Sequence, residues 1–156
     1  MTVSTASRVV LTVGNAMMGD DGAGPKLYEM MMNSSIAGWE AIDGGSAPEN
    51  ESHRVKALRP NTLVIVDAAD MGLEPGEIRL IDAESIADMF IMTTHNLPLN
   101  FLIDQLKEDI PEVFFIGIQP DVVAFAFPMT PVVSEAVDAV YQSLTRWRGE
   151  PEFEWL

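Results

Sequence analysis

The chain has 156 residues, of which 47% are hydrophobic, and a formal net charge of -15. This length fits a single domain with a sizeable core, and the negative charge argues against nucleic acid and anionic membrane surfaces as partners. The absence of cysteine excludes disulfides and thiolate chemistry. We expect one monomeric domain over residues 1–156, with loose ends at 1–7 and 149–156. Without an export signal or a membrane span, we expect it in the cytoplasm.

The first half of the chain alternates short apolar runs with helical patterns. Residues 8–13 are β-branched and almost continuously apolar, which predicts a strand buried on both faces. A glycine-rich loop follows, and apolar residues recur at helical spacing from Gly22 onward. Residues 39–42 predict a second short strand, and residues 49–58 a helix that ends before Pro60.

The second half continues this alternation. Residues 62–66 predict another buried strand, and residues 77–81 alternate apolar and polar side chains as an edge strand does. A helix is expected over 97–106, a buried strand over 113–118, and a long closing helix over 131–147.

Alternating strands and helices predict an α/β fold, a three-layer α/β/α sandwich with a twisted, mostly parallel sheet of about five strands. In such sheets, ligands bind beyond the carboxyl ends of the strands. Asp21, Asp43 and Asp67 all follow predicted strands. The sequence therefore places three carboxylates at one edge of the sheet.

The first loop, GNAMMGDDGAG over residues 14–24, has the position of a phosphate-binding loop but not its chemistry. Asp20 and Asp21 follow Gly19, where a phosphate-binding loop would need a lysine, so nucleotide binding is a distant third hypothesis. A carboxylate here could bind a hard cation or could cap the following helix. Met17 and Met18 flank this candidate site.

Asp67 and His95 supply the other candidate groups. Asp67 ends a strand so apolar that an ionised carboxylate there requires a charged, hydrogen-bonding or metal partner. His95 lies in a loop before a predicted helix. Two carboxylates and an imidazole suit a borderline divalent ion such as nickel, although zinc, cadmium or calcium could take the same ligands. An aspartic-protease pair formed by Asp21 and Asp67 is an alternative.

The segments GNAMMGDDGAG, VIVDA and TTHN, in this order, resemble the nickel-iron hydrogenase maturation endopeptidases. The resemblance runs from about residue 8 to residue 147, and further segments resemble the branch that processes hydrogenase 3 of the formate hydrogenlyase system. It implies a metal site formed by Asp21, Asp67 and His95, with aspartate at the first position where many members have glutamate. The IDGG segment implies that Asp43 is a further acid near the site, in contact with the metal ligands or with the substrate. The same kind of contact is possible for Asn15, Met17 and Met18.

The resemblance also implies a function. Such an enzyme removes the C-terminal extension of a hydrogenase large-subunit precursor after nickel insertion, recognising nickel that the substrate carries. Either the metal or a carboxylate would activate the attacking water. The alternative is a non-catalytic nickel-binding chaperone of the same partner, which would use the same three residues.

Overall fold

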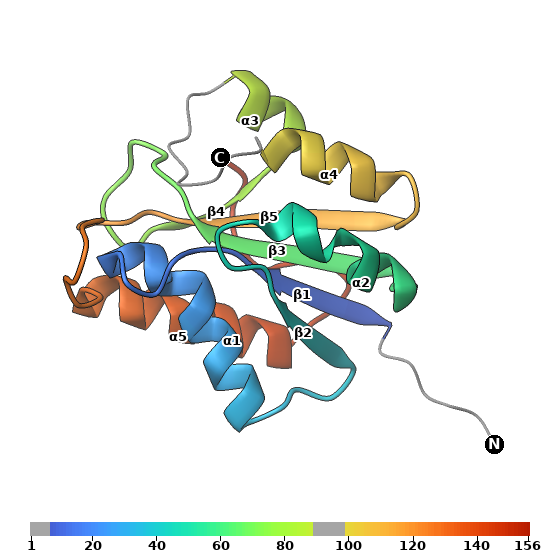
Figure 1. Ribbon diagram of the computed structural model, residues 1–156, viewed down its shortest axis with the longest axis horizontal. Coiled ribbons are helices and arrows are strands. Elements are labelled where there is room, and N and C mark those ends of the chain that lie inside the picture. The colour runs from blue at the N-terminus through green and yellow to red at the C-terminus, as the bar shows by residue number, and fades with distance from the viewer. Residues whose placement is uncertain (1–6, 89–98) are drawn as a thin grey trace.

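A computed structural model describes residues 7–88 and 99–156 (Figure 1). Within these described residues, five strands form one sheet in the order β2-β1-β3-β5-β4. Among these strands, only β4 runs antiparallel to its neighbour. The prediction of a mostly parallel sheet of about five strands is therefore confirmed. The strands are β1 (Arg8–Thr12), β2 (Trp39–Asp43), β3 (Thr62–Ala68), β4 (Ile78–Ile81) and β5 (Glu112–Ile118).

Two apolar clusters cover the two faces of the sheet, as the three-layer prediction requires. In β3 every residue is buried, with Leu63 and Ile65 in one cluster and Val64 and Val66 in the other. Successive side chains of a strand point to opposite faces, so a strand packed on both sides must be apolar throughout. This explains the continuous apolar run in the sequence.

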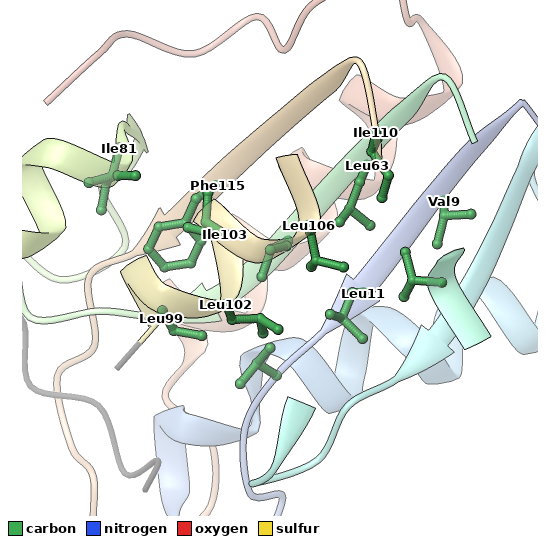
Figure 2. Packing of buried hydrophobic residues seen from close by; sticks show 14 of the residues in the cluster. Val9, Leu11, Leu63, Ile81, Leu99, Leu102, Ile103, Leu106, Ile110 and Phe115 are labelled. Carbon is green, nitrogen blue, oxygen red and sulfur yellow. The ribbon is translucent and has the colours of Figure 1, made fainter. Parts of the chain in front are cut away.

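Helices supply the outer layers on both faces (Figure 1). On one face α1 (Ala23–Asn33) packs beside α5 (Pro131–Thr145), and both contribute to the cluster that contains Val64. On the other face lie α2 (Ser52–Ala57), α3 (Ala83–Asp88) and α4 (Leu99–Lys107). Figure 2 shows the apolar side chains of α4 packed over β1, β3 and β5.

Several boundaries differ from the predictions. The strand predicted over 62–66 continues to Ala68, so Asp67 lies inside β3 and not after it. The helix predicted over 49–58 is a 3-10 turn, η2 (Pro48–Glu51), followed by the short helix α2. The short helix α3 was not predicted. Within residues 7–88 and 99–156, no helix has the length and apolarity needed to cross a membrane.

The C-terminal end is not loose where it was predicted to be. The Leu80 N–H donates to the Glu154 carbonyl at 2.8 Å, and the Leu156 N–H donates to the Leu80 carbonyl at 2.9 Å. Trp155 thus forms a parallel bridge with Leu80 of β4. An unpaired edge strand is a template for association, so the tail covers an edge that would otherwise be open.

Candidate active site

The candidate site lies at the carboxyl ends of β1 and β3, which are neighbours in the sheet. The chain leaves β1 at Val13, whose N–H donates to the Val66 carbonyl at 2.9 Å. The next residue, Gly14, donates its N–H to the Gly45 carbonyl at 2.9 Å. These two bonds hold the start of the first loop between the ends of β3 and β2.

Asp21 is positioned by the 3-10 turn η1 (Gly19–Gly22), which leads into α1. Its side chain is buried, with 3% exposure, and its Oδ2 accepts a hydrogen bond from the Asn15 N–H at 2.9 Å. The Asp21 carbonyl approaches Gly14 so closely that a Cβ at Gly14 would lie 2.1 Å from it. Gly14 also has φ of +139°, so only glycine allows the loop to fold back and bring Asp21 to the end of β1.

Asp67 lies near the carboxyl end of β3 and has no exposed surface. It is paired in register with Gly117 of β5, and strand alternation places its side chain on the same face as Ile65. β3 also contacts η1, the turn that carries Asp21. The structure therefore brings the two predicted carboxylates to the same corner of the sheet from segments 46 residues apart (67-21).

His95, the third predicted ligand, lies outside the described residues. Among the residues that the structure does describe, no three histidine, cysteine or acidic side chains gather closely enough to hold a metal ion. The described part of the site therefore consists of two carboxylates. The role of His95 stays a prediction.

The remaining candidates lie at the same edge of the sheet. The Asn15 N–H donates to the Asp21 carboxylate, and the Asn15 Oδ1 accepts a hydrogen bond from the Met17 N–H at 2.9 Å. Met17 is exposed and Met18 is half-buried. Asp43 ends β2, on the other side of β1 from β3, and its Oδ1 accepts the Gly45 N–H at 2.9 Å. Asp43 thus shares the sheet edge but is exposed and shapes its own turn.

Asp20 has a different role from its neighbour. Its carboxylate has no exposed surface and accepts three backbone N–H groups, from Asp121, Val122 and Thr130, at 2.9, 3.0 and 2.7 Å. The Thr130 hydroxyl donates to it as well, at 2.8 Å. Burial alone would raise the pKa of Asp20, but the hydrogen bonds from Thr130, Val122 and Asp121 outweigh it and hold the pKa below its ordinary value of 3.8.

The alternative that Asp20 or Asp21 caps the following helix is not supported, because the N-cap residues of η1 and α1 are Met18 and Gly22 and neither makes a side-chain cap hydrogen bond. Asp20 instead fastens the β5–α5 loop, residues 119–130, to the loop that carries Asp21. Its N–H also donates to the Val122 carbonyl at 2.8 Å. Gly19 makes this contact possible, since its φ is +59° and a Cβ there would lie 2.5 Å from the Val122 oxygen.

Gln119 was not among the residues predicted from the sequence. It is buried directly after β5, and its Oε1 accepts the N–H groups of Met71 and Leu73 at 2.7 and 3.2 Å. Its Nε2 donates to Asp70 Oδ1 at 3.2 Å. The rule that drew attention to Asp67, a polar residue following a buried apolar strand, applies equally to Gln119 and could have found it.

This arrangement defines a class of protein: an open α/β protein with buried carboxylates at the carboxyl edge of its sheet, where such folds bind their ligands. Paired carboxylates can bind a cation or activate water for hydrolysis.

Comparisons with known proteins place the chain within that class. A family model described as hydrogenase maturation protease matches residues 25–147. The hydrogenase 3 maturation protease of Escherichia coli K12 is 60% identical over 148 residues, which cover 95% of each chain. A crystal structure of a hydrogenase 3 maturation protease superimposes with a TM-score of 0.93 at 58% identity, covering 99% of both chains. The solution structure of an E. coli endopeptidase of this kind gives a TM-score of 0.89 at 60% identity, covering 96% of both.

The chain therefore belongs to the hydrogenase maturation protease family. This confirms the resemblance drawn from the sequence motifs, and with it the prediction that the protein is a peptidase, a hydrolase. It also confirms the predicted fold.

Proposed function

We propose that this protein is an endopeptidase that removes the C-terminal extension of a nickel-iron hydrogenase large-subunit precursor after nickel insertion. The observation that carries the proposal is the pair Asp21 and Asp67, which are 3% and 0% exposed at adjacent strand ends. They belong to a chain 60% identical to a hydrogenase 3 maturation protease.

Electrostatics supports recognition of nickel that is bound to the substrate. Carboxylate oxygens are ligands for divalent cations, and a cation at the carboxyl ends of β1 and β3 would be attracted by both Asp21 and Asp67. Nickel bound to the substrate would supply that cation, whereas a nickel-free precursor would not. The site would therefore favour loaded over unloaded precursors by charge.

Asp21 is suited to this role because its orientation is fixed before substrate arrives. The Asn15 N–H holds Oδ2 at 2.9 Å, and the tight passage at Gly14 restrains the backbone. We assign Asp21, Asp67 and His95 to the substrate nickel, with His95 assigned on the family resemblance alone. These oxygen and nitrogen ligands suit a borderline ion. Asp43, at the same edge, is assigned to the surrounding substrate contact.

The hydrolysis itself needs a base and a proton donor. A carboxylate at this corner takes a proton from water as the oxygen adds to the scissile carbonyl carbon. It returns that proton to the leaving nitrogen as the C–N bond breaks, which balances the reaction. We assign this role to Asp21 and Asp67, in an aspartyl-type mechanism. The cytoplasmic location and monomeric state expected from the sequence remain predictions.

The intact mass of the precursor tests this function. Nickel-loaded and nickel-free precursors are incubated with purified protein, and each mixture is also run on a sizing column. Loss of one defined C-terminal fragment from the loaded precursor alone is the expected result. Equal cutting of the nickel-free precursor would refute nickel recognition. A stable complex with an uncut precursor would instead identify a nickel-binding chaperone.

A further inference from the structure

An exposed apolar surface lies beside the candidate site. Four large hydrophobic side chains, from two loops at the carboxyl edge of the sheet, are between 42% and 66% exposed. We call this surface the loop patch: Met17, Val123, Phe125 and Phe127. Single exposed hydrophobic residues need no explanation, but a group of four that includes two phenylalanines marks an interaction surface.

Backbone hydrogen bonds join the two loops that carry the loop patch. The Ala126 N–H donates to the Met17 carbonyl at 2.8 Å, which places Met17 against the segment that carries Phe125 and Phe127. The Phe127 N–H donates to the Ala124 carbonyl at 3.2 Å and closes a tight turn between them. Ala126 has φ of +68°, a conformation rare for residues other than glycine.

The loop patch is also held in place before any partner binds. The buried carboxylate of Asp20 binds both ends of the β5–α5 loop, at Asp121 and Val122 and again at Thr130. The four apolar side chains are therefore displayed by an anchored loop. Preorganised surfaces lose less entropy on binding, which favours a role in docking.

The surroundings indicate what kind of partner fits. The two loops, residues 13–22 and 119–130, contain no lysine or arginine, and Asp121 is exposed among them. Membrane-binding apolar surfaces normally carry cationic residues for anionic lipid, so a lipid surface fits poorly. An apolar protein surface fits better.

The loop patch is continuous with the candidate site. Met17 lies on the loop that carries Asp21, two residues after Asn15, whose N–H binds the Asp21 carboxylate. A folded protein whose scissile bond reaches Asp21 therefore comes close to this loop and to the β5–α5 loop bonded to it.

We propose that the loop patch docks an apolar surface of the hydrogenase large-subunit precursor next to its cleavage site. This inference rests on the proposed function. This apolar contact contributes affinity for the precursor, while the carboxylate pair recognises the nickel that the precursor carries. Removing the patch should then weaken binding and leave the chemical step intact.

The test compares Phe125→Ala and Met17→Ala with Met32→Ala. Met32 is a matched control because it is 55% exposed, against 59% for Met17, but lies near the end of α1. Cleavage kinetics of the nickel-loaded precursor should show KM about tenfold higher for the two patch variants, as for residues central to an interface, with kcat unchanged. Met32→Ala should match the wild type. Unchanged melting temperatures establish that the variants fold, and Phe127→Ala replaces any that does not.

Binding of each variant to the precursor, measured by calorimetry, separates this inference from the proposed function. If wild type cuts the precursor and the patch variants have the same KM and Kd as wild type, the docking proposal is overturned and the peptidase function stands. Absence of cutting, together with weaker binding by the patch variants, would refute the peptidase and retain the docking surface. A wild-type dimer that Phe125→Ala converts to a monomer, with KM unchanged, would show that a second copy occupies the patch and would overturn the proposal.

Discussion

The substitution Asp20→Asn tests how much the hydrogen bonds that hold the β5–α5 loop contribute to stability. The carboxylate accepts three backbone N–H groups and one hydroxyl. An asparagine retains one acceptor oxygen and turns an NH2 group toward at least one of these donors. Each buried donor left unsatisfied costs about 1–3 kcal/mol, and the remaining bonds lose their ionic character. The expected loss is about 2–4 kcal/mol of unfolding free energy, or roughly 5–15 °C in Tm for a chain of this size.

Urea denaturation and calorimetry measure this loss, with Asp121→Asn as the matched control. Asp121 lies in the same loop, but its side chain is exposed and only its backbone N–H binds Asp20. Both substitutions remove one negative charge from a chain of net charge -15, so the general electrostatic effect is the same in each. Asp121→Asn should change stability by less than about 0.5 kcal/mol. Equal stability of the two variants would refute the anchoring role of Asp20.

Three further predictions concern stability and association. Hydrogen bonding holds the pKa of Asp20 in the folded protein below 3.8. The contribution of this carboxylate to the unfolding free energy should therefore be complete above pH 3.8 and disappear as the pH falls through the pKa of the folded state. Urea titrations from about pH 7 to about pH 3 should therefore show the difference between wild type and Asp20→Asn shrinking on acidification, and a growing difference would contradict this. Gly19→Ala adds a Cβ at a residue whose φ is +59°, and this Cβ would lie 2.5 Å from the Val122 oxygen. The substitution should therefore lower the unfolding free energy measured by calorimetry by about 2–3 kcal/mol, and an unchanged Tm would argue against that contact. Deleting residues 154–156 removes both hydrogen bonds to Leu80 and uncovers β4. Light scattering should then detect more association of the shortened chain than of wild type. Equal dispersity would show that the tail does not protect the edge.

Much of the fold could be predicted because its central strands are buried on both faces. The apolar runs of β1, β3 and β5 follow directly from that burial. The end of β3 could not be placed, since Asp67 appears in sequence as a polar stop although its backbone continues to pair with β5. The helix α3, with six residues, is too short for a reliable periodic pattern.

The site was predictable only in part. The sequence indicated that Asp21 and Asp67 lie at the same edge of the sheet, because both come at the carboxyl ends of apolar runs, and these runs form the neighbouring strands β1 and β3. It did not separate Asp20 from Asp21, which look alike in the motif. In a 3-10 turn, successive side chains diverge by about 120°, so adjacent aspartates face different surroundings. One carboxylate consequently binds the Asn15 N–H beside β1, and the other binds the distant Thr130 segment.

The rate of precursor shortening by Asp21→Asn and Asp67→Asn, relative to wild type, tests the central claim most directly. Asp138→Asn is the matched control, since it removes the same charge from an exposed position on α5. Intact mass followed over time on nickel-loaded precursor gives all four rates, and circular dichroism checks folding. Loss of a group that acts on the reacting atoms should slow cutting about 100-fold or more in each site variant, with Asp138→Asn equal to wild type. Wild-type rates in folded Asp21→Asn and Asp67→Asn proteins would contradict the assignment of this carboxylate pair as the active site.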